Sequence, residues 1–162
     1  MQRELVERLF AIYREPVYRF LRRLLRDAAV AEELAQDTFV RALGASYRAD
    51  GRERAWIFQI ARNLARDHVR SAALRQAGQR VEEPASMPDR PAVVDLNAAI
   101  AGLSDDDREV FLMRELGGLS YEEIADASGF TPDAVRSRLH RTRLTLRAAL
   151  AEPANPLRRV RS

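Results

Sequence analysis

Hydrophobic residues recur at every third or fourth position over most of the chain, and this spacing predicts α-helices. In the first 25 residues the apolar residues that follow this spacing include Leu5, Leu9, Ile12, Val17, Phe20 and Leu24. Proline is tolerated in the first turn of a helix but disrupts a helix interior, so the pair Glu15-Pro16 predicts a second helix beginning there. No stretch alternates apolar and polar residues for long enough to indicate a strand. The chain is therefore predicted to be all-α.

Two more helices are expected before the middle of the chain, at about residues 30–43 and 54–70, with a loop containing two glycines between them. Ala35, Phe39 and Leu43 would form the apolar face of the first. Residues 76–91 then hold one Gly and three Pro with few apolar side chains. Such a composition buries too little surface to offset the entropy of ordering, and it predicts a flexible linker.

The boundaries of the later helices have clear local signals. Helical spacing resumes near residue 93, and two capping-box patterns follow, Ser104-x-x-Asp107 and Ser120-x-x-Glu123. Thr131 followed by Pro132 predicts another helix start. The last two helices are separated only by the turn 128–130, which contains a glycine suited to left-handed backbone. This spacing is typical of a helix-turn-helix.

Within this helix-turn-helix, the apolar positions predict the core face, with Ile124 and Ala125 on the first helix and Val135, Leu139 and Thr142 or Leu146 on the second. The remaining face of the second helix is basic and carries Arg136, Ser137, His140, Arg141 and Arg143. Side chains of this kind bond guanine edges and phosphates in a DNA major groove. A solvated amphipathic hairpin is the alternative interpretation of the same pattern.

The charge distribution supports a polyanionic partner at the C-terminal end. All 27 basic side chains are arginine, and the formal net charge is +3. Residues 92–130 carry 2 Arg against 9 acidic residues, whereas residues 131–162 carry 8 Arg against 2. A basic segment after an acidic one indicates nucleic acid as a partner.

Composition also excludes several classes of protein. The absence of cysteine rules out disulfides and thiolate metal sites, and no apolar run has the length of a signal peptide core or a membrane span, so we expect a cytoplasmic protein. The two histidines, His68 and His140, fall in different predicted domains, with no nucleophile or phosphate-binding loop nearby. We therefore expect no enzyme activity, catalytic residue, metal or cofactor.

Two pairs of segments resemble a known family. Residues 118–125 (GLSYEEIA) and 134–141 (AVRSRLHR) resemble the C-terminal domain of extracytoplasmic-function sigma factors, group 4 of the bacterial sigma-70 family. Residues 31–42 (AEELAQDTFVRA) and 55–63 (AWIFQIARN) resemble the N-terminal domain of the same family, in the same order. The resemblance implies a promoter-recognition subunit that binds core RNA polymerase and promoter DNA, with an anti-sigma factor as a further possible partner.

The resemblance also implies a domain organisation. Residues 1–72 would form the sigma region 2 helical bundle, which binds polymerase and melts the downstream (−10) element. Residues 73–92 would be a flexible linker, and 93–151 the region 4 helix-turn-helix domain, which reads the upstream (−35) element. Residues 152–162 would be a basic, disordered tail.

Site residues follow from the same resemblance. The polar stripe on the helix at 30–43 would dock on the largest polymerase subunit through Glu33, Gln36, Asp37 and Arg41. The downstream element would be bound by Tyr47, Arg62, Asn63 and Arg66, with Tyr47 stacking on a flipped base, while Trp56 is in register with the apolar stripe and is expected in the core. The upstream element would be bound by Arg114, Arg136, Ser137, His140 and Arg141, with Arg114 on the DNA backbone.

A stand-alone helix-turn-helix regulator is the alternative function. It would use the C-terminal domain in the same way and would make the N-terminal helices a sensor or dimerisation unit. That alternative leaves the two N-terminal motifs without an explanation.

Overall fold

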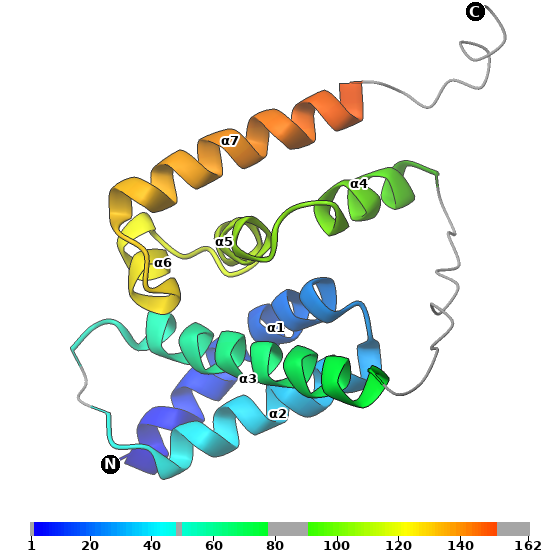
Figure 1. The fold of residues 1–162 in the computed structure, drawn as a ribbon. Coiled ribbons are helices and arrows are strands. Elements are labelled where there is room, and N and C mark those ends of the chain that lie inside the picture. Colours follow the sequence, from blue (N-terminus) through cyan, green and yellow to red (C-terminus); the bar gives the residue numbers. More distant parts are fainter. Residues whose placement is uncertain (1, 48–49, 78–90, 152–162) are drawn as a thin grey trace, which may run out of the picture.

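The computed structural model describes residues 2–47, 50–77 and 91–151, and these residues contain seven helices and no strand. The helices form two layers, with α1 to α3 in one and α4 to α7 in the other (Figure 1). This confirms the predicted all-α fold. Most of the predicted linker and all of the predicted tail lie outside the described residues. The helices are α1 (Gln2–Leu25), α2 (Ala28–Gly44), α3 (Glu53–Gln76), α4 (Pro91–Ala101), α5 (Asp105–Glu115), α6 (Tyr121–Ser128) and α7 (Pro132–Ala151).

The prediction of two helices in the first 25 residues was wrong, because α1 continues through Pro16. An interior proline costs about 3 kcal/mol of helix stability. Packing offsets this cost, since Leu9 before the proline and Val17 and Phe20 after it are all buried on one face of α1. In the continuous helix Ile12 is 61% exposed and does not belong to the core stripe.

The core of the N-terminal layer forms where α1, α2 and α3 meet. Phe20 of α1 and Phe58 of α3 are fully buried and pack edge to face, with ring centroids 5.5 Å apart. Ala35 and Phe39 of α2 are buried as predicted, whereas Leu43 is exposed. Leu43 lies in the last turn of α2, where Ala42 instead takes the fully buried position.

Helix α3 extends six residues beyond its predicted C-terminal end, to Gln76 rather than near Arg70. The added residues 71–76 are Ser, two Ala, Leu, Arg and Gln, most of which favour helix. The first glycine or proline after them is Gly78. Propensity therefore extends the helix four residues into the predicted linker of residues 73–92.

The predicted capping signals start α5, α6 and α7. Ser120 and Glu123 form the complete capping box of α6, with Ser120 Oγ accepting from the Glu123 backbone N–H at 3.1 Å. Gly129 ends α6 in the left-handed region at φ 82°, and Thr131 Oγ1 accepts from the third residue of α7. Only half of the box at Ser104 forms, because the Asp107 carboxylate pairs instead with Arg138 of α7.

The two layers pack directly against each other, with α3 against α6 and α1 against α5. The loop between α5 and α6 approaches α3 closely at Gly117. A Cβ atom added to Gly117 would lie 2.9 Å from the Phe58 ring and 2.7 Å from the Met113 carbonyl oxygen. Only glycine allows this loop to approach α3 so closely.

Candidate DNA and polymerase interfaces

The helix-turn-helix has the predicted division between core and surface. Val135, Leu139, Thr142 and Leu146 of α7 are all buried, as are Ile124 and Ala125 of α6. The opposite face of α7 exposes Arg136, Ser137, His140 and Arg141. Within the described residues, Arg136 makes only one ion pair, at 3.7 Å to Asp133, and Arg141 makes only one, at 3.8 Å to Asp107. Both distances are long for an ion pair. The face is therefore accessible to a ligand.

Arg114, at the end of α5, contacts both the loop before the helix-turn-helix and the first residue of α6. Its Nη1 donates a hydrogen bond of 2.8 Å to the carbonyl oxygen of the buried Leu119. Its guanidinium lies 5.2 Å from the centroid of the Tyr121 ring, and that of Arg136 lies 5.9 Å from the same ring. Arg114 thus stabilises the loop that leads into the helix-turn-helix.

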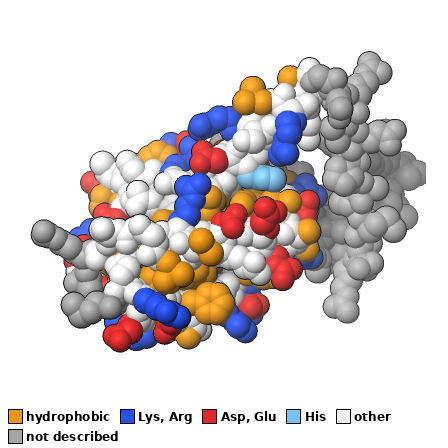
Figure 2. Space-filling model, turned by 90° about the horizontal axis from the view of Figure 1, so that it is seen from below, with side chains coloured by type: hydrophobic (Ala, Val, Ile, Leu, Met, Phe, Trp, Pro, Cys, Tyr) orange, Lys and Arg blue, Asp and Glu red, His pale blue; other side chains and the backbone are white. Residues whose placement is uncertain are grey.

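The predicted polymerase stripe lies on the outer surface of α2. Glu33, Gln36 and Arg41 are exposed, and Asp37 is half-buried. Exposed hydrophobic residues accompany them on α2 and the neighbouring part of α1, namely Phe10, Val40 and Leu43. The lower face of the molecule, seen in Figure 2, carries hydrophobic patches between acidic and basic side chains. Such a mixed surface is suited to a protein partner.

Tyr47 packs face to face on Trp56, with ring centroids 4.2 Å apart and an angle of 12° between the planes. Its hydroxyl donates a hydrogen bond to the Asp50 carboxylate. Burial and this hydrogen bond raise the pKa of Tyr47, so the hydroxyl stays protonated. Trp56 is only partly buried, which differs from the core position expected for it.

An open hollow of about 380 Å³ lies beside this aromatic pair. Trp56, Ile60 and Asn63 line it from α3, and Arg41, Gly44 and Ala45 line it from the end of α2. Asn63 is exposed and can both donate and accept hydrogen bonds at the rim. The hollow thus combines an aromatic surface with an amide, a combination suited to a planar, hydrogen-bonding ligand.

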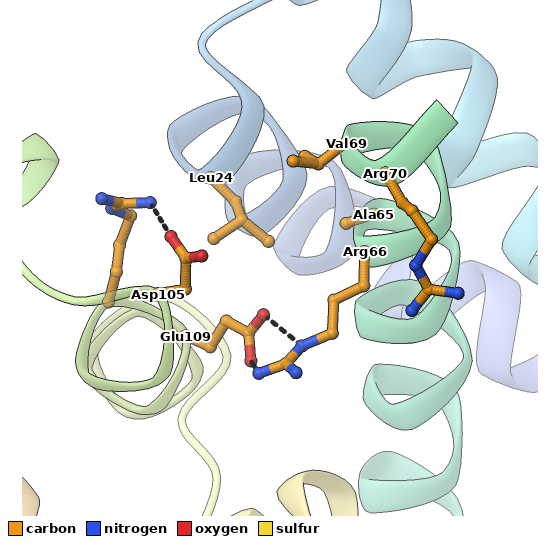
Figure 3. A pocket seen from close by; sticks show the side chains of 8 residues that line it. Leu24, Ala65, Arg66, Val69, Arg70, Asp105 and Glu109 are labelled. Carbon is orange, nitrogen blue, oxygen red and sulfur yellow. Dashed lines mark hydrogen bonds and ion pairs between the residues drawn. The ribbon is translucent and has the colours of Figure 1, made fainter. Parts of the chain in front are cut away.

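Arg62 and Arg66 point away from this hollow, toward the C-terminal layer. Arg62 Nε lies 2.7 Å from Glu109 Oε2, and Arg66 Nε and Nη2 each lie 2.8 Å from a Glu109 oxygen. Arg66 also reaches Asp106 at 2.6 Å. Figure 3 shows Glu109 of α5 facing Arg66 of α3 across the space between the layers. The structure therefore does not bring all four predicted residues of the downstream element site together.

A second set of ion pairs joins the start of α3 to α6. Arg54 binds the Glu123 carboxylate with two hydrogen bonds, one of them 2.9 Å long, and Arg52 pairs with Asp126. Arg54 lowers the pKa of Glu123 below its ordinary value. The sequence predicted Glu123 only as part of a capping box, and it did not predict these ion pairs. The signal that could have indicated them is the excess of acidic residues over 92–130, opposite the arginines of α3.

Comparisons with known proteins match each of the two helical layers to a protein family. A family model of sigma-70 region 2 matches residues 9–75, and one of sigma-70 region 4 matches residues 94–146. The ECF RNA polymerase sigma factor SigC of Mycobacterium tuberculosis is 37% identical over 148 residues, which cover 86% of this chain and 79% of that protein. The chain belongs to the sigma-70 family, as an extracytoplasmic-function sigma factor. CarQ of Myxococcus xanthus, another sigma factor, is 35% identical over 158 residues, covering 90% and 89%.

Solved structures of sigma factors support the same assignment. The sigma factor RpoE of Bartonella quintana, in complex with the anti-sigma factor NepR, matches with a TM-score of 0.76 and 26% identity, covering 90% of this chain and 96% of that one. CnrH, in complex with the cytosolic domain of CnrY, matches with a TM-score of 0.71 and 26% identity, covering 92% and 89%. The predicted sigma factor function is confirmed, and no finding favours the stand-alone regulator. Sigma factors are transcription initiation factors.

Within residues 2–47, 50–77 and 91–151, no three or more histidine, aspartate or glutamate side chains are grouped so that they could hold a metal ion. No helix in these ranges is long and apolar enough to cross a membrane.

Proposed function

We propose that this sigma factor uses three surfaces, one for core RNA polymerase and two for promoter DNA. The observation that carries the proposal is that the α2 stripe, the hollow beside Trp56 and the basic face of α7 are all accessible. Each surface lies on a rigid helix or at the end of one. The chain would act in the cytoplasm, where polymerase and DNA are found.

The polymerase surface is the α2 stripe of Glu33, Gln36, Asp37 and Arg41. It combines charged and amide groups with the exposed Val40, so a partner helix could form polar contacts around an apolar centre. The family match to region 2 supports this assignment.

The downstream element is read at the hollow between α2 and α3. A base that leaves the stack could lie against Trp56 and form hydrogen bonds with Asn63, while Tyr47 closes one side. Stacking on an aromatic ring contributes about 1–3 kcal/mol per base, comparable to the cost of unstacking. Arg62 and Arg66 would hold the phosphates of the same strand, once they are free of Glu109.

The upstream element is read by α7 in the major groove. Arg136 and Arg141 would bond guanine edges, with Ser137 and His140 beside them, and Arg114 would contact the DNA backbone. Replacing either α7 arginine by Ala should cost about 1–3 kcal/mol at one base pair, measured with polymerase on a panel of single-base promoter variants. Equal losses on every sequence would assign that arginine to a phosphate instead.

An anti-sigma factor is a further partner. The similarity in shape to sigma factors solved with anti-sigma proteins supports a comparable partner for this chain. The genome region encoding the chain and its co-purifying proteins would identify it.

The direct test of the polymerase surface is co-elution of the purified chain with core RNA polymerase on a sizing column. We expect a stoichiometric complex, because a sigma factor must bind polymerase before it reads a promoter. Because each small domain makes few base contacts and tethering raises their effective concentration, the free chain should bind promoters weakly. A chain that binds specific DNA tightly and ignores polymerase would indicate a regulator instead.

A further inference from the structure

Asp107, in the first turn of α5, faces two arginines of α7. Its Oδ1 atom accepts a hydrogen bond of 2.9 Å from Arg138 Nη1 and lies 3.8 Å from Arg141 Nη2. Arg141 is one of the two arginines proposed above to bond guanine edges. One carboxylate of α5 therefore contacts both a structural arginine of α7 and a proposed base reader.

The Asp107 carboxylate is held in place by its neighbours. Its side chain is 17% exposed, and that of Arg138 is 26% exposed. The guanidinium of Arg138 lies 4.3 Å from the centroid of the Phe130 ring, in the turn between α6 and α7. Ser104 Oγ accepts a hydrogen bond from the Asp107 backbone N–H. Because a largely buried, hydrogen-bonded ion pair is short and strong, Asp107 presents a fixed negative charge to Arg141.

The contact with Asp107 leaves Arg141 accessible to DNA. The Arg141 side chain is 63% exposed, and a separation of 3.8 Å is an electrostatic contact rather than a hydrogen bond. A guanidinium has five N–H donors, of which a bidentate contact with guanine uses two. Arg141 can therefore turn one donor toward Asp107 while two others bind a base.

A fixed carboxylate beside a base-reading arginine affects binding in two ways. It restricts the rotamers of Arg141 before DNA arrives, and ordering such a side chain only on binding would weaken affinity by about threefold to tenfold. It also disfavours poses in which Arg141 turns to a phosphate, since the phosphate would then approach the carboxylate. Both effects favour a guanine contact over a phosphate contact.

The other proposed base reader, Arg136, is paired differently. Its partner Asp133 lies three residues before it on the same helix, at 3.7 Å, and the side chains of Arg136 and Asp133 are 68% and 94% exposed. Exposed pairs of this kind contribute little, because water screens them and both side chains remain mobile. The helix-turn-helix thus has a fixed acid beside one base reader and a mobile acid beside the other.

We propose that Asp107 is a positioning residue, which orients Arg141 toward one base pair of the upstream element and increases discrimination at that pair. This inference rests on the proposed function, because it needs α7 to read the upstream element through Arg141. Removing the charge of Asp107 should lower discrimination at that base pair by about threefold to tenfold. Discrimination at the base pair read by Arg136 should not change.

The test uses the full chain bound to core RNA polymerase and a fluorescein-labelled duplex that carries a promoter located by mapping transcription starts. Dissociation constants, measured by anisotropy at one salt concentration for every single-base substitution of the upstream element, give the discrimination at each base pair. Arg141→Ala identifies the pair that Arg141 reads. Asp107→Asn, which keeps an oxygen that can accept the Arg138 hydrogen bond, should lose discrimination at that pair alone.

Two controls distinguish positioning from a structural role. Asp133→Asn removes the same charge beside Arg136, and it should keep the discrimination at both base pairs. Asp107→Asn should lower the ratio of promoter affinity to random-duplex affinity by about threefold to tenfold, and it should leave this ratio unchanged in an Arg141→Ala background. If Asp107 served only to hold α7 on α5, its loss would weaken binding at every base pair alike in both backgrounds.

The outcomes separate this inference from the proposed function. Unchanged or improved discrimination in Asp107→Asn, or an equal loss at all base pairs, overturns the positioning role and leaves the reading of DNA by α7 intact. If Arg141→Ala loses discrimination at no base pair, the proposed function of Arg141 is wrong and the inference fails with it.

A second variant decides the question if Asp107→Asn does not fold, as judged by circular dichroism. Arg138→Lys keeps the positive charge but lacks the planar group that contacts the Phe130 ring and binds Asp107, so the carboxylate becomes mobile. Discrimination should then fall at the same base pair, by a smaller factor than in Asp107→Asn. Unchanged discrimination in Arg138→Lys would overturn the positioning role.

Discussion

Arg114 is assigned two roles, a contact with the DNA backbone and a structural contact within the protein. A DNA-binding experiment alone would not distinguish them. The family resemblance assigns it to the DNA backbone, and the structure gives it a hydrogen bond to the Leu119 carbonyl and a position over the Tyr121 ring. Replacing Arg114 by Ala removes both interactions. We therefore expect the variant to lose stability as well as DNA affinity.

The size of the loss follows from these two contacts. A hydrogen bond from a charged donor contributes about 1.5–3 kcal/mol, and a cation over an aromatic ring about 0.5–1 kcal/mol at a partly exposed site. Leu119 is fully buried, so its carbonyl is left without this partner. We expect a loss of about 2–4 kcal/mol, which lowers the Tm of a chain of this size by roughly 4–16 °C.

Thermal unfolding followed by circular dichroism measures this effect. The matched control is Arg136→Ala, because Arg136 lies over the same ring at 5.9 Å and makes only a 3.7 Å ion pair to Asp133, with both side chains exposed. The control should lose less than about 1 kcal/mol. If Arg114→Ala melts like the wild type and only weakens binding to all DNA sequences alike, Arg114 is a phosphate contact and the reasoning about the loop is wrong.

Three other predictions concern the remaining surfaces. Replacing Gln36 and Asp37 together by Ala should weaken polymerase binding with helicity unchanged, and normal competition against a labelled wild-type chain would argue against docking there. Tyr47→Ala and Asn63→Ala should each reduce permanganate reactivity of the promoter bubble, with a smaller defect on a pre-melted template, because the hollow acts only after a base has left the stack; unaltered opening in both would remove that role. The folded pKa of Glu123 lies below its ordinary value of 4.5, so its ion pair stabilises the fold above that pH and is lost as the pH falls through the lower folded value. Thermal unfolding from pH 7 to pH 3 should show this loss in the wild type and less of it in Glu123→Gln, which keeps the capping-box geometry; identical pH dependence would refute it.

Local signals predicted the C-terminal layer well. The side chains of Ser120 and Thr131 cap helices by bonding to backbone N–H groups three residues later, and Gly129 ends α6 in the left-handed region. Because these interactions are local, the sequence alone indicates where the helices begin and end. The error at Pro16 has the opposite cause. There the local preference for a new helix is outweighed by burial of Val17 and Phe20 against other helices, which no local pattern reveals.

The contacts between the layers could not be predicted in the same way. Arg62 and Glu109 are 47 residues apart, with a predicted linker between them, and many other pairs of opposite charge were available. Charge patterning indicated an acidic segment but not its partner. Trp56 fits the apolar stripe of α3 by spacing. Its spacing does not reveal that the Trp56 ring packs only partly against the core, lines the hollow and stacks on Tyr47 of the preceding loop.

Transcription by purified core RNA polymerase, with and without the chain, tests the assignment as a sigma factor most directly. The template is genomic DNA from the source organism, and sequencing of RNA 5′ ends maps every start. We predict defined start sites that occur only when the chain is present and that share two sequence elements at a constant spacing. An unchanged set of starts with and without the chain, from a polymerase preparation that is active with another sigma factor, would contradict the assignment.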